Sequence, residues 1–297
     1  MLRYAYYPGC SMDSTGATYK KSIEFVAEKI GLDLREIKDW NCCGATAAHT
    51  KDEMMALALP ARNLALAESE DLGLDIAIPC AACYSRMKYS LHAVRTDEEK
   101  KEQIQEIIEM PYEGKNDVLS FLDIFSTEEA MEACRSKMVR TLSGLKVACY
   151  YGCLLSRPHE VTGGEDTENP MDMDRIVALT GAEPVDWSFK TECCGASHQV
   201  DVPKEARPLL DRILRNAQAN GAQAIVTACP LCNMNLDMRQ AEINEKMEKK
   251  YNLPVYQFTE LLAVAMGAGA KEIGLHKHFF PAFELMKKYA KRAGENG

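Results

Sequence analysis

The sequence predicts an α/β protein made of two tandem, pseudo-symmetric repeats. Each repeat is expected to have a small, mostly parallel, Rossmann-like sheet, with cysteines at the carboxyl ends of its strands. Short apolar runs alternate with amphipathic segments along the chain, which is typical of parallel strands covered by helices. A pattern of five cysteines also occurs twice within the 297 residues. Together these observations favour the duplication of one α/β unit.

Each repeat is expected to run strand, helix, strand, helix, strand, helix. In the first repeat the strands are assigned to residues 2–7, 34–40 and 74–79. In the second repeat they are assigned to residues 146–151, 183–187 and 222–228. Residues 18–31 place apolar side chains on one helical face, and Gly31 predicts the end of that helix. Thr50 and Glu53 have the spacing of a capping box and predict the start of the next helix.

The cysteines make the repeat explicit. The first set is Cys10, Cys42, Cys43, Cys80 and Cys83, and the second set is Cys153, Cys193, Cys194, Cys229 and Cys232. The first cysteine is separated from the adjacent pair by 31 residues in the first set and by 39 in the second. The pair is separated from the C-x-x-C by 36 residues in the first set and by 34 in the second. The flanking letters agree, "YYPGC" with "YYGC" and "IPCAAC" with "TACPLC". We expect one domain at residues 1–143 and another at residues 144–297.

The composition excludes several classes of function. A net charge of −9 and a pI near 5.3 argue against nucleic acid as a main partner, because phosphate binding needs a basic surface. Arg3 and Tyr4 interrupt any apolar signal sequence, and the longest weakly apolar run, residues 261–270, is too short to span a bilayer. We expect a cytoplasmic protein. In that reducing compartment, twelve cysteines more often hold metal or perform redox chemistry than form disulfides.

The five cysteines of each set follow predicted strand ends, so they are expected to converge on one point. Neighbouring cysteines in extended backbone point to opposite sides, and zinc or a cubane iron–sulfur cluster needs only four ligands. An unusual iron–sulfur assembly is therefore favoured, with zinc as the minor alternative. Taken singly, each C-x-x-C is better explained as a dithiol, and each pair as a strained disulfide or two buried thiols; the repeated set of five at strand ends favours metal ligation. Cys134 and Cys149 are expected to be core thiols.

At these residues the sequence resembles the CCG cysteine-rich domain family, whose pattern is a single Cys, a CCG and a C-x-x-C. The family occurs in tandem in the B subunit of heterodisulfide reductase from methanogens, in thiol:fumarate reductase, and in iron–sulfur subunits of glycolate, lactate and glycerol-3-phosphate oxidoreductases. The oxidoreductase subunits usually carry a ferredoxin-like C-x-x-C-x-x-C-x-x-x-C-P segment, which this sequence lacks. In that respect it looks most like the stand-alone B subunit of the heterodisulfide reductases.

The resemblance implies two noncubane [4Fe-4S] clusters, one per cysteine set. By position the first is expected on Cys10, Cys42, Cys43, Cys80 and Cys83, and the second on Cys153, Cys193, Cys194, Cys229 and Cys232. The implied reaction is reduction of the coenzyme M–coenzyme B mixed disulfide to two thiols. Implied partners are the iron–sulfur (C) and flavin-containing (A) components of heterodisulfide reductase, with a hydrogenase or formate dehydrogenase as further candidates.

A disulfide takes up two electrons whereas iron–sulfur clusters pass them singly, which gives a physical reason for two clusters beside one substrate. The anionic substrate should attract basic residues near the strand ends. Six follow the cysteine motifs: Arg86, Lys88, Arg157, His159, His198 and Arg239. Two competing functions remain: an electron-carrying CCG protein in lactate or glycolate oxidation, and a zinc-stabilised scaffold without a redox role.

Overall fold

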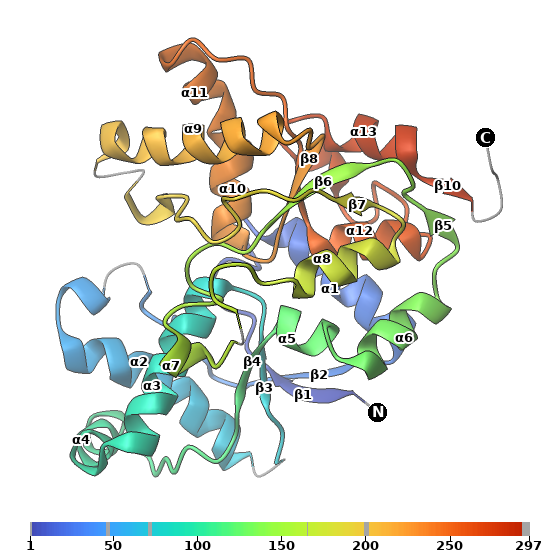
Figure 1. The fold of residues 1–297 in the computed structure, drawn as a ribbon. Helices are drawn as coiled ribbons and strands as arrows, with labels where there is room; N and C mark the ends of the chain where they lie inside the picture. Colours follow the sequence, from blue (N-terminus) through green and yellow to red (C-terminus); the bar gives the residue numbers. More distant parts are fainter. Residues whose placement is uncertain (1, 46–47, 71–72, 165, 199–201, 293–297) are drawn as a thin grey trace.

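The computed structural model describes residues 2–45, 48–70, 73–164, 166–198 and 202–292 (Figure 1). It contains two parallel sheets of four strands each. The first has the order β2-β1-β3-β4, with β1 Arg3–Tyr6, β2 Asp33–Glu36, β3 Ile76–Ile78 and β4 Val118–Ser120. The second has the order β7-β6-β8-β9, with β6 Lys146–Tyr150, β7 Glu183–Pro184, β8 Ala224–Thr227 and β9 Val255–Gln257. The predicted α/β class and tandem repeat are confirmed.

Each sheet has one strand more than the three expected from the sequence. The fourth strands, β4 and β9, come from the matching segments "DVLSFLDIF" and "PVYQFTELL". Both are parallel edge strands, and Ile76 of β3 pairs with Val118 of β4. Their short apolar runs continue directly into a helix, so the sequence pattern reads as one helical segment. The central strand β3 is fully buried, as its continuous apolar run predicts.

Helices cover both sheets. In the first repeat they are α1 Ala17–Ile30, η1 Ala48–Thr50, α2 Glu53–Ser69, α3 Ala81–Thr96, α4 Glu98–Ile108, α5 Phe121–Phe125 and α6 Glu128–Ser136. In the second they are α7 His159–Thr162, α8 Asp172–Leu179, η2 Ala196–His198, α9 Pro203–Ala219, α10 Pro230–Met238, α11 Gln240–Lys246, α12 Phe258–Ala265, η3 Leu275–Lys277 and α13 Ala282–Tyr289. A two-stranded antiparallel ribbon, β5 Arg140–Thr141 with β10 Lys291–Arg292, joins the middle of the chain to its end.

Two helix boundaries test the sequence signals directly. α1 ends at Gly31, which is left-handed with φ of 71°, as predicted. The predicted capping box of Thr50 and Glu53 is wrong. Asp52 is the N-cap of α2, and its side chain accepts a hydrogen bond from the Met55 amide. Thr50 belongs to the separate turn η1, which ends before α2 begins, so the helix starts later than the motif implied.

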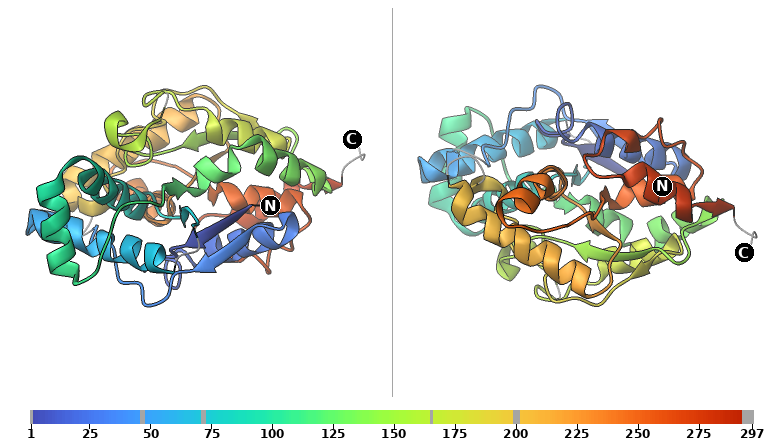
Figure 2. Two further views of the ribbon diagram at one scale, coloured as in Figure 1. Left: turned by 90° about the horizontal axis from the view of Figure 1, so that it is seen from below. Right: turned by 90° about the horizontal axis from the view of Figure 1, so that it is seen from above.

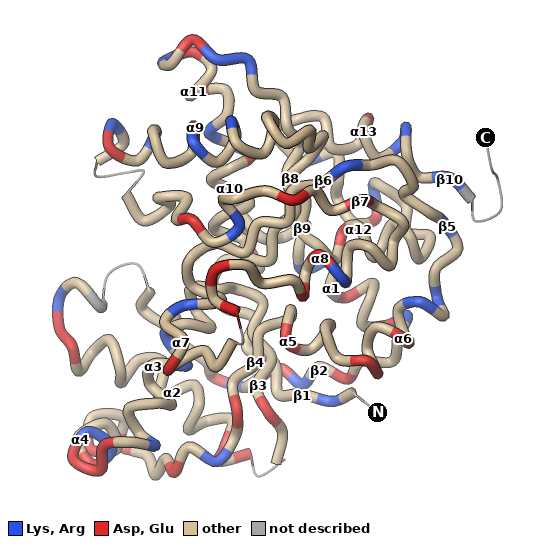
Figure 3. The backbone as a smooth tube through the Cα atoms, in the orientation of Figure 1, with Lys and Arg blue, Asp and Glu red and all other residues tan. Residues whose placement is uncertain are grey.

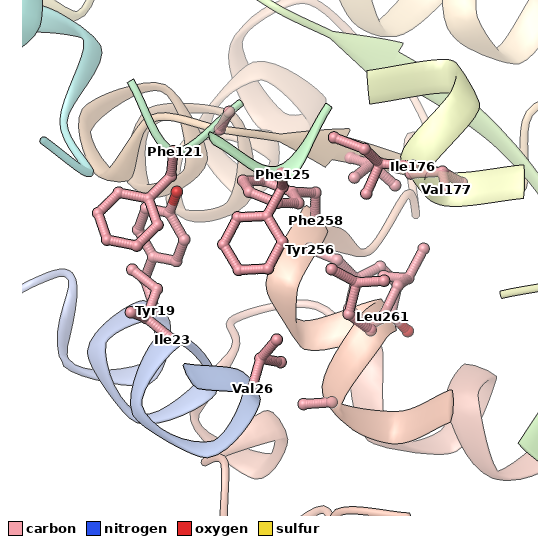
Figure 4. Packing of buried hydrophobic residues seen from close by; sticks show 14 of the residues in the cluster. Tyr19, Ile23, Val26, Phe121, Phe125, Ile176, Val177, Tyr256, Phe258 and Leu261 are labelled. Atoms are coloured by element: carbon pink, nitrogen blue, oxygen red, sulfur yellow. The ribbon is translucent and has the colours of Figure 1, made fainter. Parts of the chain in front are cut away.

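The largest hydrophobic cluster lies between the repeats and is shared by them. α1 packs against α12, and α5 packs against α8, so helices of each repeat contact helices of the other (Figures 1 and 2). Aromatic rings fill this space, with Phe125 edge-on to Phe258 at 5.5 Å between ring centroids (Figure 4). The Ser22 and Thr259 hydroxyls hydrogen-bond across it at 2.6 Å. The shared core fixes the orientation of one repeat against the other.

Candidate metal centres

Each cysteine set lies at the carboxyl end of its own sheet. Cys10 follows β1, the pair Cys42 and Cys43 follows β2, and Cys80 follows β3. Cys80 is also the N-cap of α3, whose first turn carries the second cysteine of the C-x-x-C. The second set repeats this placement after β6, β7 and β8, where Cys229 is the N-cap of α10. The structure thus brings together the residues that the strand-end argument grouped.

The five thiols of the first set follow one another in a line of interacting neighbours. Cys42 acts on the pKa values of both Cys10 and Cys43. The Sγ atoms of Cys43 and Cys83 lie 3.1 Å apart, and Cys80 acts on the pKa of Cys83. Cys10 and Cys42 are exposed whereas the other three are buried. The line of sulfurs therefore runs from the surface into the core.

The second set has the same arrangement. Near the surface, Cys193 is the largest influence on the pKa of Cys153. Further in, the Sγ atoms of Cys194 and Cys232 lie 3.6 Å apart, and Cys229 acts on the pKa of Cys232. Cys193 is exposed, and Cys194 and Cys229 are buried. Both sets therefore combine an open outer end with a buried inner end.

The inner ends of the two sets meet. The interaction with Cys229 is the largest influence on the pKa of Cys80, and Cys80 in turn acts on the pKa of Cys229, so the C-x-x-C of one repeat lies near that of the other. We call the surroundings of these two thiols the junction. The sequence predicted two separate pockets, one per repeat, and gave no indication that they touch. All ten predicted cysteines therefore belong to one continuous region at the centre of the protein.

The loop after each first cysteine reaches across to the other repeat. A Cβ added at Gly16 would lie 3.2 Å from the Pro230 Cβ, so the loop that follows Cys10 contacts the start of α10. In the second repeat, Leu154 and Leu155 pack against the buried cluster of the first repeat, and α7 packs on α3. Each helix that begins with a C-x-x-C is thus contacted by a segment of the opposite repeat, so each site includes residues from both repeats.

A buried tyrosine holds the backbone ahead of each cysteine pair. The Tyr7 hydroxyl donates to the Asn41 carbonyl oxygen at 2.9 Å, and the Tyr150 hydroxyl donates to the Glu192 carbonyl oxygen at 2.6 Å. Asn41 and Glu192 directly precede the two pairs. The tyrosine side chains are 0% and 1% exposed. Because the peptide unit is planar, a hydrogen bond to its carbonyl also fixes the following amide, where each pair begins.

The CCG motif requires its glycine for two reasons. Gly44 and Gly195 have left-handed φ angles of 73° and 72°, which side chains other than glycine rarely adopt. A Cβ at Gly44 would also lie 2.8 Å from the Ala48 Cβ and 2.9 Å from Leu59 Cδ1. A Cβ at Gly195 would lie 3.0 Å from Leu209 Cδ1. The close packing brings each cysteine pair against the helix that follows it.

Hydrogen bonding lowers the pKa of Cys43 in the first pair and of both Cys193 and Cys194 in the second. The hydrogen bond with Cys83 lowers the pKa of Cys43 to about 7 against the opposing effect of burial. The hydrogen bond with Cys153 lowers the pKa of Cys193 to about 6. The backbone amide of Gly195 assists by donating to Cys193 Sγ at 3.3 Å. Thiolate is the form that binds metal, so these sites are suited to metal ligation.

Helix amides act on the C-x-x-C motif of the second repeat. The hydrogen bond with Cys232, that with Cys80, and the backbone amides of Leu231 and Cys232 together lower the pKa of Cys229 well below its usual range. These amides belong to the first turn of α10, where backbone donors have no helical partner. At Cys80 the hydrogen bond with Cys229 is the largest influence and raises the pKa. The two thiols at the junction thus have pKa values shifted in opposite directions.

Several buried hydroxyl groups beside the cysteines have no hydrogen-bond partner among the described residues. Ser11 follows Cys10, Ser85 lies two residues after Cys83, and Ser156 lies in the loop after Cys153. Buried hydroxyls are normally satisfied, so these groups fit a bound group with acceptor atoms such as sulfides. Across the described ranges, no three His, Cys, Asp or Glu side chains are grouped so as to hold one metal ion. The donor set fits an extended cluster bound along each line of sulfurs.

The remaining sequence predictions have mixed outcomes. Cys134 and Cys149 are buried in the shared core, at 1% and 0% exposure, as expected. Lys and Arg are interspersed with Asp and Glu along the backbone (Figure 3). Of the six basic residues, Arg239 pairs with Glu242 at 2.9 Å. Arg157 Nη2 pairs with Glu168 at 2.6 Å and donates to Thr191 Oγ1 at 2.8 Å, two residues before Cys193.

The pattern of the cysteine-rich domain CCG matches residues 4–88 and 147–237, which include all ten cysteines of the two sets. The chain belongs to the CCG family. The resemblance inferred from the sequence is confirmed. The family match and the named relatives below indicate an iron–sulfur redox role for this CCG protein. The assignment of the ten cysteines as ligands stays a prediction.

Full-length relatives carry two kinds of name. Over 288 residues, the chain is 35% identical to the "8-methylmenaquinol:fumarate reductase membrane anchor subunit" of Wolinella succinogenes, covering 95% of this chain and 98% of that protein. It is 30% identical over 294 residues to the B subunit of the "Ferredoxin/F(420)H(2)-dependent CoB-CoM heterodisulfide reductase" of Methanosarcina acetivorans, with 97% of both chains covered. The B subunit of the "Ferredoxin:CoB-CoM heterodisulfide reductase" of Methanosarcina mazei is 27% identical, also with 97% of both covered. The CCG protein is thus similar to subunits of two kinds of redox complex.

A solved structure shares the fold. The crystal structure of a hypothetical protein from Helicobacter pylori matches with a TM-score of 0.70 at 12% identity, covering 93% of this chain. The chain spans about half, 51%, of that protein's length. As for membranes, none of the helices in the described part of the CCG protein is both long and apolar enough to cross a bilayer.

Sequence reasoning missed the residues that shape the sites around the cysteines. Tyr7 and Tyr150 were assigned only to strands, although each stands three residues before the first cysteine of its set. This equal spacing was the signal that could have identified them. The contact between Cys80 and Cys229 left no such signal, because it depends on how the two repeats pack together.

Proposed function

We propose that this CCG protein is the disulfide-reducing component of an iron–sulfur complex. One noncubane [4Fe-4S] cluster is held by each set, the first by Cys10, Cys42, Cys43, Cys80 and Cys83 and the second by Cys153, Cys193, Cys194, Cys229 and Cys232. When bound, such clusters supply electrons one at a time. The closeness of Cys80 and Cys229 carries the proposal. Each thiol acts on the pKa of the other, and the loop after Cys10 contacts Pro230 beside Cys229, so one substrate that needs two electrons could meet both sets.

The chain's own residues supply the binding site and its surroundings. The outer thiols, Cys10, Cys42 and Cys193, are exposed and leave each set open to a small molecule from solvent. The inner thiols Cys80 and Cys229 are buried, at 2% and 3% exposure, and keep water from the junction. One disulfide, two electrons and two protons give two thiols, so the protein must accept both sulfur products close together.

The proposed substrate is the coenzyme M–coenzyme B mixed disulfide, whose acidic groups require a cationic partner. Arg157 is a suitable candidate, because it lies beside Thr191, two residues before Cys193. Its buried Nε has no hydrogen-bond partner among the described residues. An unsatisfied guanidinium donor beside a thiol site supports a role in anion binding.

The names of the two Methanosarcina relatives support the existence of partner proteins, because each is named as one component of a larger reductase. We propose the iron–sulfur (C) and flavin-containing (A) components of heterodisulfide reductase as electron donors, with a hydrogenase or formate dehydrogenase upstream. We further propose a cytoplasmic location and a division into domains at residues 1–143 and 144–297. The boundary lies just after β5, whose pairing with β10 ties the linking segment to the end of the chain.

The test is an anaerobic preparation with iron, sulfide and turnover measured on the same sample. Two clusters of four irons correspond to about eight iron atoms per chain, and the reduced complex should convert the mixed disulfide to two thiols. Cys80→Ser should lower iron content and abolish turnover. Cys134→Ser changes a buried thiol outside both sets and is the matched control. A colourless protein, or full turnover by Cys80→Ser, would refute the proposal.

A second candidate function is electron transfer without disulfide chemistry. It is favoured by the 35% identity to the fumarate reductase protein named above. In that case the two sets pass electrons between partners, and the junction holds no substrate. Assaying the reduced complex in parallel with the mixed disulfide, fumarate and 2-hydroxy acids separates the two, because only the first candidate predicts thiol release. The 2-hydroxy acids test the lactate or glycolate alternative.

A further inference from the structure

Tyr19 is a fully buried tyrosine whose hydroxyl has no hydrogen-bond partner among the described residues. It lies in the first turn of α1, one turn after Gly16, where the loop from Cys10 contacts Pro230. Its ring is edge-on to Phe258, with centroids 6.4 Å apart. Figure 4 shows it within the shared aromatic core. A buried hydroxyl without a partner is unfavourable, so its retention needs an explanation.

The surroundings of the hydroxyl identify the missing partner. After burial, the charged group that acts most strongly on the Tyr19 phenol is Cys229, and Cys80 is among the others. These two thiols define the junction. Gly16, one turn before Tyr19, contacts Pro230, the residue directly after Cys229, so the start of α1 lies beside the junction. Burial raises the pKa of Tyr19 well above its usual value, which keeps the group a neutral O–H donor. The atoms that collect at the junction are sulfurs, which accept hydrogen bonds best as anions.

We propose that Tyr19 donates a hydrogen bond to a sulfur anion at the junction in the cluster-loaded protein. This inference rests on the proposed function, because the acceptor is absent from the chain itself. The acceptor is either a sulfur of the bound cluster or a sulfur of the disulfide substrate. Both are the same chemistry, a sulfur carrying negative charge. Tyr19 stabilises that charge without giving up its proton, so no further reactant is needed.

Tyr112 provides a matched control. Its hydroxyl is also buried without a partner among the described residues, but it lies away from the cysteines, where Glu68 and Arg95 are its charged neighbours. Tyr19→Phe and Tyr112→Phe therefore remove the same kind of group from two apolar sites. In the metal-free protein we expect both variants to unfold at or above the wild-type midpoint, because neither hydroxyl makes a hydrogen bond there. A markedly lower midpoint for Tyr19→Phe alone would overturn the inference.

The cluster-loaded proteins distinguish the two sources of sulfur. If the acceptor belongs to the cluster, Tyr19→Phe shifts the reduction potential of the resting protein and gains less thermal stability on loading than Tyr112→Phe does. If the acceptor is the substrate, potentials stay unchanged and kcat/KM for the disulfide falls about 10- to 100-fold, as expected for loss of a hydrogen bond to a charged group. If both variants have the same reduction potential, the same gain in thermal stability on loading and the same kcat/KM, the inference is overturned. If the wild-type protein binds iron but does not reduce a disulfide, the proposed reaction is refuted. The reduction potentials of the two variants then still show whether Tyr19 bonds to a sulfur of the cluster.

Discussion

Replacing Gly44 by alanine should destabilise the protein more than the same change at a glycine of equal backbone conformation elsewhere. Gly31 and Gly44 have φ angles of 71° and 73°, but nothing lies within 4 Å of a Cβ at Gly31. Gly31→Ala therefore measures the left-handed strain alone, about 1–2 kcal/mol. At Gly44 the added Cβ also meets Ala48 at 2.8 Å. Ala48 cannot move without its backbone, and crowding of this kind costs a further 1–3 kcal/mol or so.

The expected order of destabilisation is Gly31→Ala, then Gly195→Ala, then Gly44→Ala. Gly195 is intermediate because its nearest neighbour is Leu209 Cδ1 at 3.0 Å, the end of a side chain that can rotate. The assay is urea denaturation of the metal-free proteins at constant m-value, followed by iron content after loading. We expect Gly44→Ala to lose iron, because the displaced backbone carries the neighbouring thiols. If Gly44→Ala is no less stable than Gly31→Ala, the crowding argument fails.

Two further predictions concern buried hydrogen bonds. Tyr7→Phe removes the hydrogen bond ahead of the first cysteine pair, so the free energy of unfolding should fall by about 1 kcal/mol. The reduction potential of the first cluster should also shift, whereas that of the second cluster, the internal control, should not. Equal shifts in both potentials would contradict a local role for Tyr7. Burial opposes a charge on His278, but Glu260 at 3.1 Å, together with Asp237, raises its pKa to about 9. Its folded pKa exceeds the unfolded value near 6.5, so up to about 3 kcal/mol of stability is present below pH 6.5 and lost as pH rises through 9. His278→Gln should remove this dependence in pH-resolved denaturation and the exposed His276→Gln should keep it; an unchanged profile in His278→Gln would disprove it.

The sequence predicted those parts of the fold that depend on local pattern. Continuous apolar runs gave the central strands, and cysteines directly after them gave the strand-end clusters. The capping box at Thr50 failed because the chain makes a separate turn, η1, before Asp52 starts α2. The fourth strands were missed because each is only three residues long and runs straight into a helix. Their equivalence was visible in the repeat, but their pairing with a neighbouring strand was not.

What the sequence could not predict is the packing of one repeat against the other. Two equal units can pack in many ways, and only the shared core, with α1 against α12 and α5 against α8, selects one. That choice brings Cys80 near enough to Cys229 for each to act on the pKa of the other, and it brings the start of α1, which carries Tyr19, against the start of α10. Duplication therefore does more than double the number of thiols. It creates a junction that neither repeat has alone, so a variant that loosens the shared core should impair chemistry at the junction before it removes either cysteine set.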